Sequence, residues 1–159
     1  MKAEYINPFI EASINIIKQT TGLSAKLGNI FVKDKPYANE NIIVLIGLTG
    51  QILGSAVISF KKPIALKIAS GMMMGMQVNE LDEIAKSAIG ELCNMILGNT
   101  ATIFSQKGIN IDITPPTIFT GDNIELTIHK SIVVCVPLIF DDGNQIQIDI
   151  SYLDNENKK

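Results

Sequence analysis

Residues 79–106 constrain the fold most, because they combine helical periodicity with an almost complete lack of charge. Apolar side chains recur every three or four residues and form one face of a helix. They are Leu81, Ala85, Ala88, Ile89, Leu92, Ile96 and Ile103. From Ser87 to Gln106 the only charged residue is Glu91. A helix of this composition must be buried on most of its sides, so we expect the rest of the chain to pack around it.

Capping residues predict where the helices begin and end. Asn79 is the expected N-cap of the long helix, and Gly108 is its expected C-terminal stop. A first helix is predicted from Asn7, which precedes a proline suited to the first helical position, to the stop at Gly22. Residues 62–70 predict a short helix between these two.

Apolar segments bounded by turn residues predict strands in the remainder of the chain. These segments are residues 25–32, 42–48, 52–60, 112–120, 124–129, 131–140 and 145–153. The second and third are expected to form a hairpin that turns at Thr49 and Gly50. Pro137 has no N–H to donate to a neighbouring strand, so residues 131–140 are expected to hold either a bulge or a sheet edge.

The order of the predicted elements repeats along the chain. A helix, a glycine stop, a long connection and a hairpin occupy residues 7–60, and the same order recurs in residues 79–153. We therefore predict one domain over 1–153, with pseudo-repeats at about 5–60 and 79–153, followed by a charged tail at 154–159. The expected fold is α+β, with one antiparallel sheet and two long helices on one face, related by an internal pseudo-twofold duplication.

Methionine and cysteine occur in apolar surroundings. The run Met72, Met73 and Met74 is predicted to fill gaps in the core more readily than to form an adaptable binding surface. Cys93 and Cys135 are both expected to be buried thiols of a protein from a reducing compartment.

Composition excludes several classes of partner. The chain carries 13 Lys+Arg against 16 Asp+Glu, and its lysines occur singly or in pairs, so we expect no nucleic-acid-binding face. No apolar run reaches the ~18 residues of a membrane span, and Met1 is not followed by the apolar core of a signal peptide. A cytoplasmic protein without membrane contact is expected. Because hydrophobic residues make up 47% of the chain, we also predict a homodimer, with 131–140 as its candidate edge.

Common catalytic motifs are missing from the sequence. His129 is the only histidine, and neither a metal-ligand pattern nor a Ser–His or Cys–His pair accompanies it. Gly71 and Gly75 lie in the methionine-rich segment instead of following a strand, as a phosphate-binding loop would require. Most familiar reactions on small molecules therefore lack the side chains that they need.

A narrow band of polar and small residues runs along the long helix, opposite its apolar face. Its members are Ser87, Glu91, Asn94, Gly98, Thr102 and Ser105. Their spacings of three and four residues place them on one side of the helix. We call this band the polar stripe. The residues alone leave two interpretations open, namely a solvent-exposed helix face and a surface whose small residues allow close approach by a partner.

Glutamate and asparagine three residues apart can support a limited chemistry. The Asn94 amide can orient a water molecule but cannot deprotonate it, and the Glu91 carboxylate can bind a cation such as a lysine ammonium. A reaction that needs only an aligned water, with metal and electrophile supplied by the substrate, fits this pair. Phosphoryl hydrolysis through a loose transition state is a reaction of that kind.

Ser87, Glu91 and Asn94 follow a family motif of Asp or Ser, three residues, Glu, two residues and Asn, with a proline some twenty residues downstream. Pro115 and Pro116 lie in that downstream region, at a slightly different spacing. In this context the sequence resembles the CheC/CheX/FliY family of chemotaxis phosphatases, over essentially the whole chain. The first helix carries Glu11 and Asn15 at a spacing of four, without the motif. The resemblance therefore favours a CheX-like member with a single site.

The resemblance implies a specific activity. Such proteins dock on the phosphorylated response regulator CheY and accelerate hydrolysis of its aspartyl phosphate. Glu91 would pair with the regulator's lysine, Asn94 would orient the attacking water, and Ser87 and Gly98 would line the docking surface with Glu91. The protein would need no cofactor of its own, because the Mg²⁺ ion belongs to CheY. CheX-like members form dimers.

Two alternatives remain open at this point. The polar stripe could belong to a non-catalytic docking module of the flagellar switch or receptor array. The chain could also be a purely structural dimer without a phosphorylated partner. Release of phosphate from phosphorylated CheY, with and without this protein, distinguishes the catalytic interpretation from both alternatives.

Overall fold

The computed structural model describes residues 2–34, 41–122, 124–128 and 131–153. In these ranges the helices are α1 (Ala3–Thr21), α2 (Lys62–Met72) and α3 (Glu83–Gln106). The strands are β1 (Ala25–Leu27), β2 (Phe31–Lys33), β3 (Ile42–Gly50), β4 (Leu53–Phe60), β5 (Ile111–Ile113), β6 (Thr117–Thr120), β7 (Val133–Phe140) and β8 (Gln145–Leu153).

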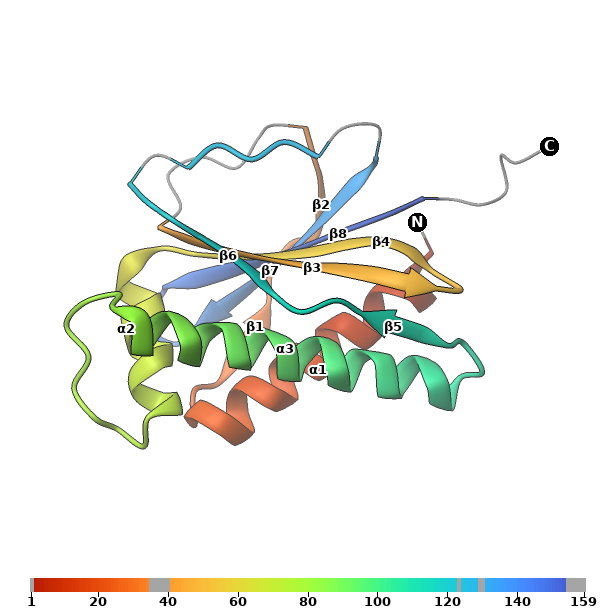
Figure 1. Ribbon diagram of the computed structural model, residues 1–159. Coiled ribbons are helices and arrows are strands. Elements are labelled where there is room, and N and C mark those ends of the chain that lie inside the picture. Colours follow the sequence, from red (N-terminus) through yellow and green to blue (C-terminus); the bar gives the residue numbers. More distant parts are fainter. Residues whose placement is uncertain (1, 35–40, 123, 129–130, 154–159) are drawn as a thin grey trace.

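The strands form one antiparallel sheet, in the order β1-β7-β8-β4-β3-β5. Strand β2 continues along β7 beyond β1, and β6 continues along β3 beyond β5. Figure 1 shows the helices together on one face of this sheet. The predicted α+β fold, an antiparallel sheet with long helices on one face, is therefore confirmed, and the shorter α2 joins α1 and α3 on that face.

The two halves of the chain interlock within the sheet. The short strands of the first half, β1 and β2, pair with β7 of the second half. In the same way β5 and β6 pair with β3 of the first half. This exchange is the arrangement that an internal duplication would produce, and the pseudo-repeats and single-domain boundaries stay a prediction. The tail at 154–159 lies outside the described residues.

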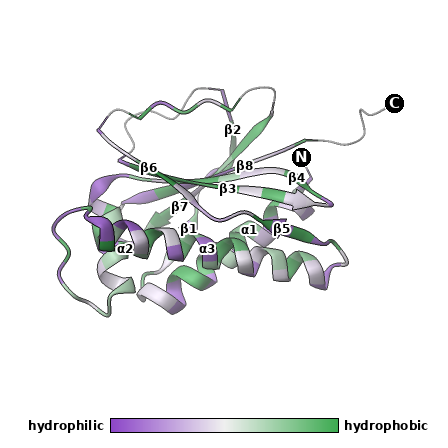
Figure 2. Ribbon diagram, viewed as in Figure 1, coloured by the Kyte–Doolittle hydropathy of each residue, from purple (hydrophilic) through white to green (hydrophobic). Residues whose placement is uncertain are grey.

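Alternation along the central strands separates the two faces of the sheet. On β4 and β8, every second side chain is buried against the helices. These residues are Ala56, Ile58, Phe60, Ile146, Ile148 and Ile150. The rings of Phe9 and Phe104 join α1 to α3, with centroids 5.8 Å apart in a T-shaped arrangement. Figure 2 shows that hydrophobic and hydrophilic positions also alternate along the helices.

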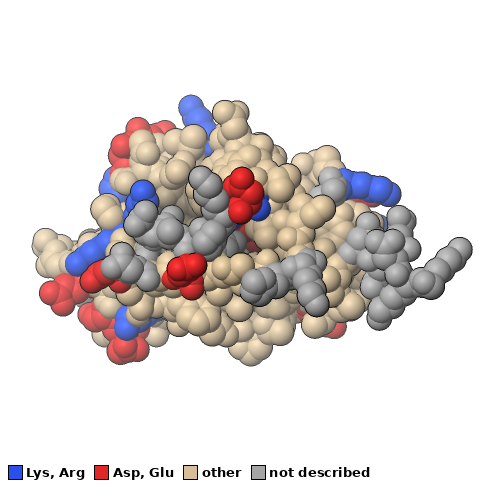
Figure 3. Space-filling view, turned by 90° about the horizontal axis from the view of Figure 1, so that it is seen from above, with Lys and Arg blue, Asp and Glu red and all other residues tan. Residues whose placement is uncertain are grey.

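The opposite face of the sheet has a smaller apolar cluster. Ile43 and Val57 are buried there, packed against Ile124, Leu126 and Ile128. Residues 124–128 do not form the strand predicted at 124–129. They form an irregular segment over the sheet, in which one residue makes an isolated β-bridge. His129 lies outside the described residues. Uncharged residues make up most of the described surface on this side, as Figure 3 shows.

Two helix starts differ from the capping prediction. Helix α1 begins at Ala3, so its proline lies inside the helix and removes one backbone hydrogen bond. Tyr5 stabilises the extra turn, because its ring packs in a T-shaped arrangement on that of Tyr152, with the ring centroids 5.8 Å apart. Helix α3 is capped by Asp82, which accepts a hydrogen bond from Ala85 N at 2.8 Å. Asn79 accepts a hydrogen bond from the Gln77 side chain instead.

Residues 131–140 were predicted to hold either a bulge or a sheet edge, and the edge is ruled out because Pro137 lies in the interior strand β7. Its carbonyl accepts a hydrogen bond from Gly28 N at 2.9 Å. Because the N–H and C=O of a strand residue point to the same neighbour, the missing N–H faces the interruption between β1 and β2. There, residues 28–30 bulge opposite the two residues 136–137, and the predicted strand 25–32 divides.

The predicted strand 112–120 divides for a similar reason. Pro115 and Pro116 separate β5 from β6, and the three residues 114–116 span two residues of β3. Gly47 makes room for this bulge, because a Cβ atom there would lie 2.9 Å from Thr114 Cγ2. The predicted turn of the β3–β4 hairpin was also displaced, since β3 extends through Gly50.

The methionine run fills the core only in part. Met72 is partly buried and packs against the core as predicted, whereas Met74 is 97% exposed, because α2 continues through Gly71 and carries the following residues beyond the packed layer. Burial of both Cys93 and Cys135 is confirmed. Burial raises the pKa of the Cys93 thiol far above its usual value, so this thiol is not a candidate nucleophile.

Candidate active site

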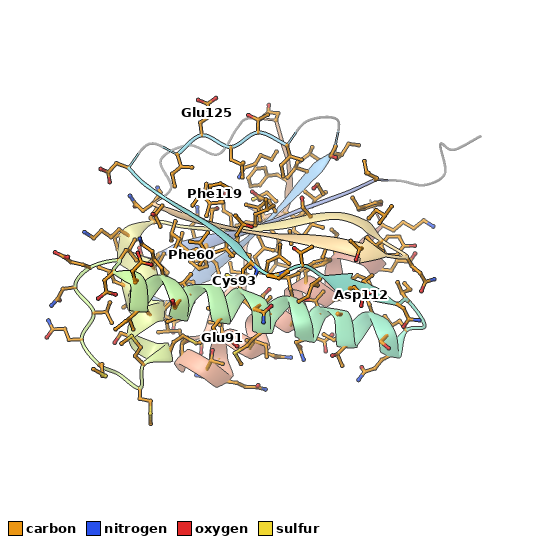
Figure 4. All side chains as sticks on the ribbon, in the orientation of Figure 1. Phe60, Glu91, Cys93, Asp112, Phe119 and Glu125 are labelled. Atoms are coloured by element: carbon orange, nitrogen blue, oxygen red, sulfur yellow. The ribbon has the colours of Figure 1, made fainter. Side chains whose placement is uncertain are left out.

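The polar stripe lies on the side of α3 that faces away from the sheet. Ser87, Glu91, Thr102 and Ser105 are exposed, and Asn94 and Gly98 are partly buried. Figure 4 shows Glu91 on the outer side of α3 and Cys93 on the side facing the sheet. The periodicity of the sequence therefore predicted the orientation of this helix correctly.

The inner side of α3 is held firmly in place. Its residues Ile89, Leu92, Cys93 and Ile96 are fully buried against the sheet and the other helices. Their neighbour Phe104 packs on α1, which fixes the far end of the helix. Side chains on the stripe are thus presented from a rigid element, as a preorganised site requires.

Glu91 and Asn94 have polar groups available for a partner. Among the residues that the structure describes, Glu91 forms no salt bridge and the Asn94 side chain forms no hydrogen bond. The two threonine hydroxyls of α3 are satisfied within the helix: Thr100 Oγ1 donates to Ile96 O at 2.8 Å, and Thr102 Oγ1 donates to Gly98 O at 3.2 Å. The acid and the amide are instead left available to a partner.

Two of the surface hollows lined by described residues lie elsewhere on the molecule. One, of about 130 Å³, lies beside the Lys67–Asp142 ion pair, and the other, of about 290 Å³, is lined by residues that include Lys62 and Lys86. Hydrogen bonds from Lys67 and then Asn144 lower the pKa of Asp142 to about 2. Neither hollow includes a residue of the polar stripe. The stripe is an exposed helix surface, which suits a macromolecular partner better than a small ligand.

The remaining residues of the sequence prediction belong to other elements than α3. Pro115 and Pro116 are in the bulge between β5 and β6. Glu11 and Asn15 are both exposed on α1. Within the described ranges, no three His, Cys, Asp or Glu side chains lie close enough together to hold a metal ion. None of the helices in those ranges is long and apolar enough to cross a membrane.

Comparison with known proteins points to one family. The sequence pattern of the family described as "Chemotaxis phosphatase CheX" matches residues 42–138, a region that contains all of α3. The CheY-P phosphatase CheX of Thermotoga maritima is 38% identical over 126 residues, which cover 79% of this chain and 81% of that protein.

Solved structures agree over nearly the whole chain. A CheC-like superfamily protein from Shewanella sp. PV-4 superimposes with a TM-score of 0.88 at 27% identity, covering 97% of this chain and 100% of the other. The matching chain in the CheX-CheY-BeF3-Mg²⁺ complex from Borrelia burgdorferi has a TM-score of 0.83 at 26% identity, with coverages of 96% and 100%.

Proposed function

The chain belongs to the chemotaxis phosphatase CheX family, and from this membership we propose that it is a CheY-P phosphatase. It docks on phosphorylated CheY through the polar stripe of α3 and accelerates hydrolysis of the aspartyl phosphate. The observation that carries the proposal is the unpaired Glu91–Asn94 pair on the outer side of a rigid helix. A cytoplasmic location, beside CheY, is part of the same proposal.

The two residues have different roles in this proposal. Asn94 orients the attacking water with its amide, because an amide can donate and accept hydrogen bonds but cannot take the proton at neutral pH. Glu91 accepts a hydrogen bond from the active-site lysine of CheY and so fixes the docked orientation. Exposed Ser87 and partly buried Gly98 line the same contact.

The Mg²⁺ ion is proposed to come with the regulator. The solved Borrelia complex holds CheY, BeF3 and Mg²⁺ together with CheX, which supports this assignment. Mg²⁺ would neutralise charge on the phosphoryl oxygens, and this chain would contribute the alignment of water alone.

The direct test measures phosphate release from phosphorylated CheY in the presence and absence of the protein. We expect the protein to accelerate phosphate release at substoichiometric amounts, and the rate to saturate as the concentration of phosphorylated CheY rises. An unchanged rate, combined with binding to CheY, would favour the non-catalytic docking module of the flagellar switch or receptor array.

Glu91→Ala is expected to weaken binding of CheY by about 10- to 150-fold in Kd, since a hydrogen bond to a charged group contributes about 1.5–3 kcal/mol. The melting temperature should stay unchanged, because Glu91 is exposed and forms no salt bridge in the described protein. Isothermal titration with beryllofluoride-treated CheY and thermal unfolding measure the two effects. Glu11→Ala, which removes an exposed carboxylate from α1, is the matched control and should bind normally. A large fall in melting temperature for Glu91→Ala would show that its role is structural.

We also propose that the protein is a homodimer, although not through the predicted strand. Strand β7 is paired on both sides, whereas the outer side of β1 and β2 ends the sheet and exposes Phe31 and Val32. Sedimentation at tens of micromolar should give twice the chain mass of 17.3 kDa. Val32→Lys should shift the protein toward monomers by placing a charge in the interface. A monomeric wild-type protein would contradict the proposal.

A further inference from the structure

Glycine inside a helix needs a reason, because it destabilises the helix relative to alanine. In the described helices glycine occurs at position 71 of α2 and at positions 90 and 98 of α3. None of the three has a positive φ, so the backbone conformation does not require glycine. The reason must lie in the space beside each residue.

Packing within the chain explains the first two glycines. A Cβ atom at Gly71 would lie 2.7 Å from Thr21 Cβ, where α2 crosses the end of α1. A Cβ atom at Gly90 would lie 2.8 Å from Ile118 Cδ1, where α3 packs on β6. Gly71 is required by the packing, because a Cβ atom there would also lie 2.9 Å from the backbone Cα of Thr21, whereas at Gly90 the end of the Ile118 side chain would have to move.

Gly98 has no such neighbour. Among the described residues, a Cβ atom there would meet no atom within 4 Å outside the backbone of its own helix. The residue follows Asn94 by one turn on the polar stripe, and Thr102 follows it by another turn. The Thr102 hydroxyl bends back to donate to Gly98 O at 3.2 Å. No side chain therefore projects from α3 at position 98, beside Asn94. The glycine lowers helix stability, and the packing of the described residues does not explain its presence.

We propose that Gly98 is a positioning residue for the phosphatase reaction, which lets CheY approach α3 closely enough for Asn94 to reach the aspartyl phosphate. The inference rests on the proposed function. Asparagine is a short side chain, and a water molecule that it aligns must lie within hydrogen-bond distance of its amide. The helix backbone must therefore come close to the regulator. A methyl group at position 98 would hold the two surfaces apart, and a displacement of about 1 Å is enough to spoil such an alignment.

The test is Gly98→Ala, because this change should affect stability and activity in opposite directions. The melting temperature should rise by about 2–4 °C, since alanine is the better helix former and no atom of the described residues opposes the methyl group. The value of kcat/KM for phosphate release from CheY-P should fall by about 10- to 100-fold. Binding of CheY in its beryllofluoride and Mg²⁺ form should weaken in parallel.

Glu11→Ala is the matched control. Glu11 is exposed on α1, outside the polar stripe, and the change likewise places alanine on a helix surface. It should change neither kcat/KM nor binding. Gly71→Ala should give the opposite pattern to Gly98→Ala in stability, with a lower melting temperature, because its methyl group would meet the backbone of Thr21.

The outcomes separate this inference from the proposed function. If wild-type protein releases phosphate and Gly98→Ala is equally active, the inference is overturned and the function stands. A lower melting temperature for Gly98→Ala would overturn it too, because the glycine would then serve the fold. If wild-type protein binds CheY without releasing phosphate, the function fails, and weaker binding by Gly98→Ala would still support close approach at this position. Absence of both activity and binding would overturn both.

Discussion

Asn94→Ala is expected to lower the maximal rate of phosphate release from CheY-P by about 10²–10³-fold, or about 2.7–4 kcal/mol. The reason is that one well-placed polar group in a water-poor site is lost, while the surrounding contact is retained. Asn94 forms no side-chain hydrogen bond within the described protein, so the fold loses little. Single-turnover phosphate release at saturating protein measures the effect.

Binding distinguishes this loss from a loss of docking. Asn94→Ala should bind beryllofluoride-treated CheY within a few-fold of wild type, whereas Glu91→Ala should bind weakly. Asn94→Gln should rescue little activity, because the extra methylene displaces the amide by about 1 Å. Asn99→Ala, five residues further along the same helix and off the stripe, is the control and should remain active. Normal phosphate release by Asn94→Ala would refute the catalytic assignment.

The features that were predicted correctly depend on residues close together in the sequence. The apolar periodicity of α3 places the polar stripe on its outer side, and the glycines after α1 and α3 end those helices. Gly22 and Gly108 have φ values of 75° and 79°, the left-handed conformation expected of such stops. Helical periodicity and the conformation of a stop are local properties, so a single sequence contains them.

The features that were missed depend on strands or side chains elsewhere. The predicted strand 25–32 divides because its partner contains Pro137, more than 100 residues away. Gly98 was placed on the stripe by spacing, but only the surrounding structure distinguishes it from Gly71, which the packing of α2 on α1 requires.

A buried ion pair is another feature that the sequence could not reveal. Lys33 Nζ on β2 lies 2.6 Å from Asp149 Oδ2 on β8, and it donates to Gln147 Oε1 at 3.1 Å. Strand β7 lies between β2 and β8, so the lysine reaches across it, on the sheet face opposite the helices. The two partners are separated by 116 residues, and nothing near either position indicates the other.

Lys33→Met is expected to lower the free energy of unfolding by about 3–5 kcal/mol, because it leaves the Asp149 carboxylate buried without its cation. The Asp149 side chain is 0% exposed, and its second oxygen has no hydrogen-bond partner among the described residues. For a chain of this length the melting temperature should fall by roughly 6–20 °C. Chemical denaturation, followed by circular dichroism, measures the change.

Two further variants show whether the ion pair itself causes this loss. Lys26→Met removes an exposed lysine from β1 and should change the free energy of unfolding by less than ~0.5 kcal/mol. Adding Asp149→Leu to Lys33→Met should recover most of the lost stability, because apolar residues can replace a buried ion pair at little cost. Phosphate release per folded molecule should be the same in all of them at low temperature, since the pair and the polar stripe lie on opposite sides of the sheet. If Lys33→Met unfolds like wild type, the carboxylate must find another partner, and β2 is not held in place by this contact.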